Sequence, residues 1–202
     1  PGSRTVCRQG LRPDLRMVGR PAILFRTHLE NIRPGEFIVI SVSMLGKLKY
    51  WLKRFVKSHS NKLCLIFDES DELTNDTSQR TRNTLNLFRR CSYKILATGT
   101  TTRNNVAEQY SQLSLLYNNS VNMMCWCSKV YHQDRETHEI ADAPNEFYGE
   151  PFPAYGGASL FKSCFCPGKV TVFGIEKHNQ DIYNKEVLWE LNAKTVLTRK
   201  FR

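Results

Sequence analysis

The sequence predicts an α/β protein in which helices flank a parallel sheet, joined to an irregular inserted subdomain. Between residues 37 and 117, apolar runs typical of strands alternate with segments of helical periodicity. The strand-like runs are nearly continuous in apolar residues, which is typical of strands buried on both faces of a parallel sheet. Such alternation favours parallel strands joined by right-handed crossovers. After Tyr117 this rhythm stops.

Three short apolar runs are the predicted strands. Residues 37–42 form a β-branched run, and residues 63–67 and 93–97 form two more. Residues 44–57 change to helical periodicity, since their apolar side chains recur on one helical face. Those side chains are Leu45, Leu48, Leu52, Phe55 and Val56.

Two capping-box spacings predict the starts of two further helices. Asp76 is followed three residues later by Gln79, which predicts a helix to about residue 90. Asn105 and Glu108 have the same spacing and predict a helix that ends near Tyr117.

Residues 118–184 read as an insertion or subdomain with a different composition. The segment is rich in aromatics and holds four prolines, the pair Gly156-Gly157 and two Cys-x-Cys pairs, and a short strand is expected at 170–173. Residues 185–193 look helical again. We therefore expect a partial lobe at 1–117, the insertion at 118–184, and a segment at 185–202 that closes the lobe.

The charge of the chain points to a polyanionic partner. Lys and Arg total 29 against 19 Asp and Glu, a net charge of +10, which favours nucleic acid or an anionic membrane surface. No apolar run reaches the roughly 20 residues of a membrane span, and no leader pattern is present. We expect a chain outside the membrane.

The cysteines and the first residues bear on compartment and completeness. Seven cysteines, an odd number, argue against an extracellular disulfide framework and for a reducing compartment. We expect a cytoplasmic protein, or a nuclear one in a eukaryote. The chain begins Pro1-Gly2-Ser3 without Met, and we expect it to be a piece of a longer protein.

Polar motifs follow two of the predicted strands. Asp68-Glu69 comes directly after residues 63–67, and Thr98-Gly99-Thr100 follows the next strand. Ligands of open α/β sheets bind at the carboxyl ends of the strands. Paired acids at this position are typical of a Walker B site, in which the first acid holds Mg²⁺ through its water shell and the second activates water. A solvated acidic turn is the alternative interpretation.

The order of the motifs resembles the Swi/Snf-type helicase-like ATPases. Residues 65–75 (LIFDESDELTN) resemble the Asp-Glu-Ala-His box with its following Leu-Lys-Asn, and residues 78–82 resemble the Ser-x-Arg segment. Residues 96–105 (LATGTTTRNN) are similar to Leu-Thr-Gly-Thr-Pro-x-Gln-Asn-Asn, and 106–111 follow as Leu-x-Glu-Leu-Trp-Ser does. Ser70-Asp71 stands where the family has Ala-His, Thr101 where it has Pro, and Arg103 where it has Gln.

This resemblance covers about residues 37–117, more faintly 194–201, and implies a fold and roles. The fold would be the first RecA-like lobe of a superfamily-two motor, a P-loop NTPase. Asp68 would bind Mg²⁺ and Glu69 would act as general base. Four further residues would couple the nucleotide state to nucleic-acid binding: Asp71, Thr98, Gly99 and Thr100.

The resemblance also implies parts that the 202 residues do not contain. A phosphate-cradling loop needs Gly-x-x-x-x-Gly-Lys-Ser/Thr, and neither Gly-Lys pair of the chain fits. In the family this Walker A loop lies upstream and the second lobe downstream. ATP and Mg²⁺ would be cofactors of the full-length parent, and this chain alone should hydrolyse little ATP.

Basic residues supply a candidate nucleic-acid surface. Lys49, Lys53 and Lys57 recur every four residues on the predicted helix 44–57, beside interleaved aromatics. Arg103 and Asn104 follow the Thr-Gly-Thr motif. We expect these residues to bind nucleic acid, with double-stranded DNA the favoured form. An ordinary solvated helix face is the alternative for the lysines.

Two cysteine pairs raise the question of zinc. Cys125 with Cys127, and Cys164 with Cys166, would each point to one face if they lay on strands, so two neighbouring strands could offer four thiolates to Zn²⁺. Zinc ribbons usually have two-residue spacers, and buried cysteines also serve as small hydrophobes. The sequence leaves both interpretations open.

Two functions from different classes follow from these patterns. The first is a fragment of an ATP-dependent nucleic-acid translocase or helicase. The alternative is a nucleic-acid-binding module without catalysis that has a zinc site. A metal-dependent nuclease built on Asp68, Glu69 and Asp71 is a third, which leaves the Thr-Gly-Thr motif unexplained.

Overall fold

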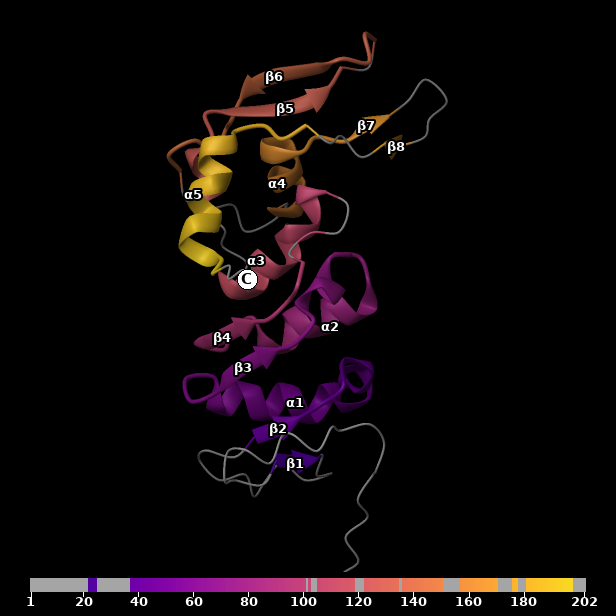
Figure 1. Cartoon of the computed structure of the whole chain (residues 1–202), viewed down its shortest axis with the longest axis vertical. Coiled ribbons are helices and arrows are strands. Elements are labelled where there is room, and N and C mark those ends of the chain that lie inside the picture. The colour runs from indigo at the N-terminus through magenta and orange to yellow at the C-terminus, as the bar shows by residue number, and fades with distance from the viewer. Residues whose placement is uncertain are drawn as a thin grey trace, which may run out of the picture.

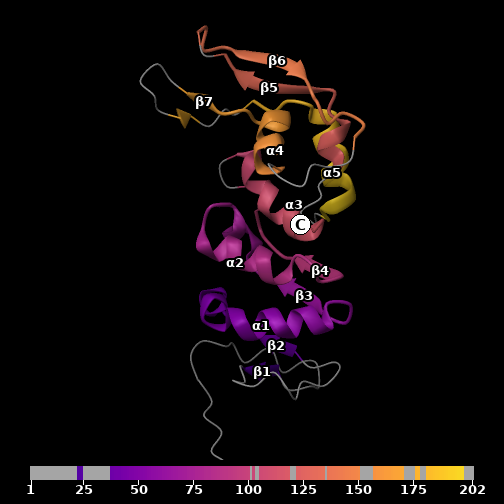
Figure 2. The same ribbon diagram turned by 180° about the vertical axis from the view of Figure 1, so that it is seen from behind.

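The described elements up to residue 144 follow one another along the long axis of the molecule, and the later helices turn back toward its middle. The computed structural model describes residues 22–24, 37–100, 102, 105–118, 122–134, 136–150, 157–170, 176–177 and 181–197. Strands β1 (Ala22–Leu24) and β2 (Phe37–Val39) lie at one end, and the hairpin of β5 (Lys129–Gln133) and β6 (Ile140–Pro144) lies at the other (Figure 1). The view from behind shows the same order (Figure 2).

The first half contains two small parallel sheets of two strands each. β1 pairs with β2, and β3 (Cys64–Phe67) pairs with β4 (Tyr93–Leu96). The predicted α/β class, a parallel sheet with flanking helices, is confirmed at this level. The strand predicted at 37–42 ends at Val39, because a 3-10 helix, η3 (Val42–Met44), leads directly into the next helix.

The helices of the first half lie close to the predicted ranges. They are α1 (Leu45–His59), η4 (Ser70–Leu73), α2 (Gln79–Phe88), η5 (Val106–Glu108) and α3 (Gln109–Leu116).

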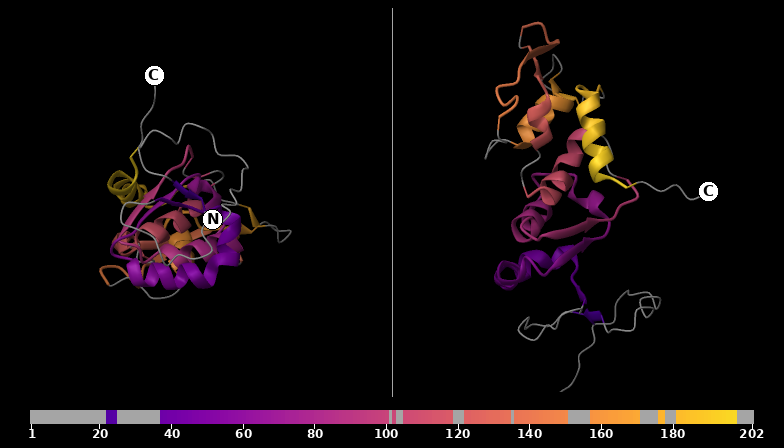
Figure 3. Two further views of the ribbon diagram at one scale, coloured as in Figure 1. Left: turned by 90° about the horizontal axis from the view of Figure 1, so that it is seen from below. Right: turned by 90° about the vertical axis from the view of Figure 1, so that its left-hand side faces the viewer.

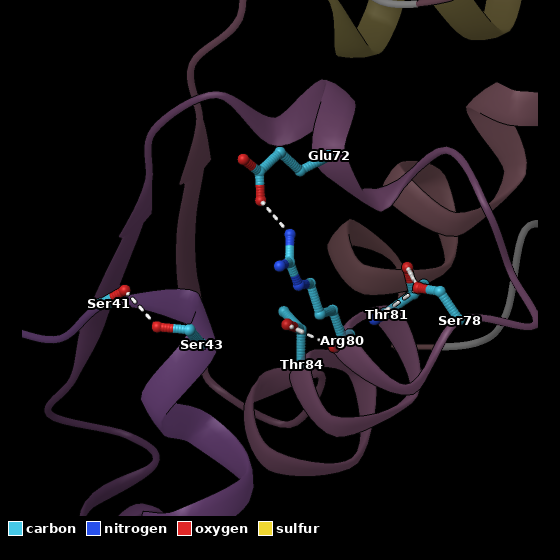
Figure 4. A network of polar contacts seen from close by, with 7 residues as sticks. All are labelled: Ser41, Ser43, Glu72, Ser78, Arg80, Thr81 and Thr84. Carbon is cyan, nitrogen blue, oxygen red and sulfur yellow. Dashed lines mark hydrogen bonds and ion pairs between the residues drawn. The ribbon is translucent and has the colours of Figure 1, made fainter.

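The caps of these helices differ from the prediction. The N-cap of α2 is Ser78, not Asp76: the Ser78 hydroxyl accepts the Thr81 backbone NH at 3.2 Å, because Ser78 directly precedes the first helical residue with extended backbone (Figure 4). The side chain of Asn105 makes no capping hydrogen bond.

The parallel pair β3–β4 is covered on one face. Phe67 packs with Leu73 and Leu115 in a cluster that Leu65 and Leu96 adjoin. On the opposite face, Ile66 is 57% exposed and its register partner Ile95 is 55% exposed, so the predicted burial on both faces is wrong for the described chain. An apolar run indicates which residues form a strand, and it does not indicate how many layers cover that strand.

The second half is built from short elements with separate antiparallel pairings. β5 pairs with β6, and β7 (Lys169–Val170) pairs with β8 (Glu176–Lys177). Of the strand predicted at 170–173, Val170 belongs to β7, and residues 171–173 lie outside the described part of the chain. The helical elements are η6 (Asn122–Trp126), α4 (Gly157–Phe165) and α5 (Lys185–Thr195).

The largest core cluster joins this second half to α3. Phe161 of α4 is fully buried and lies between Phe165 and Tyr110, at centroid distances of 4.9 and 5.5 Å. Leu113 of α3 and Leu191 of α5 belong to the same cluster. Every residue from Gln109 to Leu115 is buried, because α3 lies between the two halves (Figure 3, right). Among the described helices, none is long and apolar enough to cross a membrane.

Candidate functional site

Strands β3 and β4 end at the same edge, where their polar continuations meet. The register pairs Phe67 with Leu96, and the Ala97 backbone NH donates to the Phe67 carbonyl at 2.8 Å. The chain then turns back over β4, since the Ser70 NH donates to the Ala97 carbonyl at 2.9 Å. The structure therefore places the Asp68-Glu69 pair beside the loop that begins at Thr98, as the parallel arrangement predicts.

The paired acids are exposed at this edge, and the second has an unusual backbone. The Asp68 carboxylate accepts the Glu69 NH at 3.1 Å. Glu69 has φ 53° and ψ 52°, the left-handed region, which costs a residue with a Cβ roughly 1–2 kcal/mol. Strain of this kind collects at functional sites, where the surrounding structure holds it in place. Here the Ser70–Ala97 backbone bond does so.

Asp71 and Thr98 connect the two loops. Asp71 is buried, and its Oδ1 lies 3.2 Å from the Thr98 hydroxyl. The same hydroxyl lies 2.8 Å from the Thr100 carbonyl, and it accepts the Thr100 NH at 3.1 Å. A hydroxyl has one proton, so Thr98 fully donates to one of these two acceptors at a time. At Gly99 an added Cβ would meet open space, so packing does not require glycine there.

A buried hydrogen bond behind the acids was not foreseen from the sequence. The Ser70 hydroxyl donates to Gln112 Oε1 of α3 at 3.1 Å, and both residues are buried. One turn earlier on α3, Gln109 Nε2 donates to Asn192 Oδ1 of α5 at 2.5 Å. The only signal in the sequence is a pair of glutamines three residues apart in a helix that carries no charged residue.

An exposed ion pair lies near the acidic loop. Arg80 extends from α2 toward Glu72, with Nη1 3.6 Å from Oε2 (Figure 4). The two side chains are 62% and 43% exposed, so solvent screens the pair and its contribution to stability is at most about 1 kcal/mol. On the other side of the same view, the hydroxyls of Ser41 and Ser43 lie 2.9 Å apart.

The carboxylates at this edge are oxygen donors, the kind of ligand that magnesium prefers. In the described ranges, no three His, Cys, Asp or Glu side chains converge as metal ligands. Mg²⁺ is usually held by one or two carboxylates, with waters and phosphate oxygens completing the octahedron. The exposed Asp68 carboxylate fits that mode of binding.

Of the four candidate zinc ligands, two lie in helical segments and two directly after them, and none lies on a strand. Cys125 belongs to η6 and Cys164 to α4, and Cys127 and Cys166 follow these elements. All four are buried, and because they are not on strands they do not form an open strand face.

Two of these thiols, those of Cys164 and Cys166, are held in their protonated form. A hydrogen bond with Cys127, together with burial, raises the pKa of Cys164 far above its ordinary value. Burial raises the pKa of Cys166 to about 11, although Lys162 and the Ala107 NH oppose the shift. Buried, protonated thiols act as small hydrophobes, and a zinc ion would have to displace these protons to bind the same cysteines.

The nucleic-acid candidates are placed in part. Lys49, Lys53 and Lys57 are exposed on α1, as predicted. Arg103 and Asn104 lie outside the described residues.

No protein-family model, curated protein or solved structure matches the chain.

Proposed function

We propose that this chain is part of an ATP-dependent nucleic-acid translocase or helicase, a partial RecA-like lobe that supplies the water-activating acids. One observation carries the proposal: two polar motifs in the family's order meet at the carboxyl edge of β3–β4, with the Thr98 hydroxyl 3.2 Å from Asp71. Residues 118–184 would be the inserted subdomain, and 185–202 would close the lobe.

Asp68 and Glu69 would divide the chemistry between them. Bound ATP·Mg²⁺ supplies the phosphoanhydride bond and the charge that polarises it. The exposed Asp68 carboxylate would hold the ion through its water shell. Glu69 would orient the attacking water and accept its proton. The left-handed backbone of Glu69 fixes where its side chain leaves the loop.

The Thr98 hydroxyl would couple this edge to nucleic acid. When it donates to Asp71, it ties the acidic loop to the Thr-Gly-Thr loop, and when it donates to the Thr100 carbonyl it releases that tie. A small shift of Asp71 would therefore change the conformation preferred by residues 98–100. Arg103 and Asn104 follow in sequence and would contact the nucleic acid.

In this proposal, another segment of a longer protein would bind the phosphates of ATP. The 202 residues contain no Gly-x-x-x-x-Gly-Lys-Ser/Thr loop, so this chain would supply half of an ATP site. The other half would be an upstream Walker A segment and a downstream second lobe. On its own, the chain should hydrolyse little or no ATP.

The test is Glu69→Gln in the full-length protein that carries this sequence. Nucleic-acid-stimulated hydrolysis should fall at least about 100-fold, because the amide cannot accept the proton, while ATP still binds. The matched control is Glu72→Gln, an exposed acid paired with Arg80, which should stay within about two-fold of the parent. Full turnover in the Glu69→Gln protein would refute the role of Glu69.

The second candidate is a non-catalytic nucleic-acid-binding module, favoured by the net charge of +10. It predicts salt-dependent DNA binding that Asp68→Ala leaves unchanged, together with an absence of ATP hydrolysis by the full-length protein. Structural zinc in such a module would be detected by metal analysis of the purified chain. ATP hydrolysis by the full-length protein that is lost in the Asp68→Ala variant would favour the translocase over the non-catalytic module.

A further inference from the structure

Helix α1 carries positive charge that has no acidic partner among the described residues and that the proposed ATP site does not use. Its 15 residues include five Lys or Arg and no acid. Among the described residues, none of these five side chains forms an ion pair. Like charges at i, i+4, such as Lys49 with Lys53 and Lys53 with Lys57, destabilise a helix by a few tenths of a kcal/mol each. A polyanion would relieve this repulsion.

The outward face of α1 places an aromatic ring among those cations. Leu45, Leu52 and Val56 are buried against the rest of the protein, and Tyr50 lies on the opposite side of the helix. Residues three, four and seven apart share a helical face, so four cations surround Tyr50. They are Lys47, Lys53, Arg54 and Lys57, all of them exposed.

Two rings are exposed at this surface. Tyr50 is 65% exposed and Trp51 is 43% exposed, with their centroids 5.6 Å apart and their planes nearly perpendicular. The Arg54 guanidinium lies 5.9 Å from the centroid of Tyr50. Figure 3 (left) shows α1 along an outer side of the molecule. We call Lys47, Tyr50, Trp51, Lys53, Arg54 and Lys57 the basic aromatic face.

We propose that the basic aromatic face binds a single strand of nucleic acid. The cations would contact successive phosphates, and Tyr50 would stack on an unpaired base, which is the combination that single-strand-binding surfaces use. A duplex keeps its bases stacked inside and would leave Tyr50 unused. This proposal does not rest on the carboxylate edge, and it chooses a strand form that the sequence did not predict.

A membrane surface fits α1 less well than nucleic acid does. A helix that lies on a membrane inserts its apolar face below the headgroups. The apolar side of α1 is already occupied, since Leu45 and Leu52 are each 3% exposed and pack with Leu87 of α2. Only the Lys and Arg side chains of α1 would then be left to interact with lipid headgroups, and the exposed rings of Tyr50 and Trp51 would have no partner.

The test measures binding of a short fluorescein-labelled oligo(dT) to the 202-residue chain by anisotropy across a salt series. Lys53→Gln/Lys57→Gln should weaken binding at least ten-fold at low salt. The slope of log K against log salt should fall by about 1.4, because each single-strand phosphate that a lysine neutralises contributes about 0.7. The matched control, Lys162→Gln/Lys185→Gln, removes two exposed cations outside α1 and should stay within about two-fold.

Tyr50 separates stacking from charge. Tyr50→Ala should weaken oligo(dT) binding by about 5- to 100-fold and leave the salt slope unchanged, whereas Tyr50→Phe keeps the ring and should retain affinity. The side chain is exposed, so circular dichroism should show the same fold in all variants. Unchanged affinity of Tyr50→Ala, tighter binding to duplex or to phosphatidylserine vesicles, or no binding at low salt would each overturn the proposal. ATP hydrolysis enters none of these readouts.

Discussion

The hydrogen bond between Ser70 and Gln112 should be a measurable part of the stability of the protein. The Ser70 hydroxyl is fully buried and donates to Gln112 Oε1 at 3.1 Å, across 42 residues of sequence. Ser70→Ala removes this donor, so the buried Gln112 Oε1 loses its hydrogen bond from residue 70. Loss of a buried partner costs about 1–3 kcal/mol, a large share of the roughly 5–15 kcal/mol that stabilises a domain.

The assay is urea unfolding of the 202-residue chain, followed by circular dichroism, with the m-value as a check on two-state behaviour. The second variant, Gln112→Leu, leaves the Ser70 hydroxyl buried and should cost a similar amount. The double variant removes both polar groups, so it should cost less than the sum of the single changes by about 1 kcal/mol. That difference is the coupling energy of the pair.

Ser111 offers a matched control from the same helix. Its hydroxyl is buried, and within the described chain it has no hydrogen-bond partner. Ser111→Ala therefore removes a serine hydroxyl of equal burial without breaking a bond, and it should leave the stability unchanged or raise it. If Ser70→Ala and Ser111→Ala have the same effect, or if the Ser70–Gln112 cycle gives no coupling, the reasoning is refuted.

Three further predictions use backbone strain, pH and thiol accessibility. Glu69→Gly should be more stable to urea than Glu69→Ala by roughly 1 kcal/mol, because only glycine adopts φ 53° without a Cβ clash; equal stabilities would contradict this. Burial raises the pKa of the Cys166 thiol from 9.0 to about 11, so its contribution to stability is complete below pH 9 and is lost as the pH rises to 11. Between pH 9 and 11, the urea midpoint of the Cys166→Ala variant should therefore fall less than that of the parent chain. Maleimide labelling with peptide mapping should modify exposed Cys64 in the native chain and buried Cys91 only in denaturant. Release of one zinc per chain on unfolding would contradict the interpretation of the four buried cysteines of the second half as small hydrophobes.

The sequence predicted the local elements well, because their signals are local. Residues 45–57 repeat their leucines at helical spacing, and α1 covers Leu45–His59. The run at 93–97 predicted β4 within one residue. The cap of α2 shows where such signals become ambiguous: Asp76 and Ser78 both precede the helix, and the choice depends on the first residue that adopts helical backbone.

Long-range contacts were beyond the reach of the sequence pattern. Nothing near Ser70 indicates a partner on α3, and nothing in residues 64–67 indicates that Ile66 stays exposed while Phe67 is buried. The zinc interpretation of the two Cys-x-Cys pairs depended on their lying on strands, because alternate residues of a strand share a face. In the structure, Cys127, Cys164 and Cys166 belong to the core around Phe161, which gathers residues from α3 to α5.

Helix α3 gives the two halves of the chain a direct polar connection. Gln112 accepts a hydrogen bond from Ser70, next to the candidate base, and Gln109 donates to Asn192 of α5 at 2.5 Å. Because the two glutamines lie one turn apart on a buried helix, a shift of α3 that lengthened one bond would also strain the other. The acidic loop and the second half should therefore respond together. If that coupling exists, Asn192→Ala should change hydrogen exchange at the Ser70 amide, and an unchanged rate would show that the halves act independently.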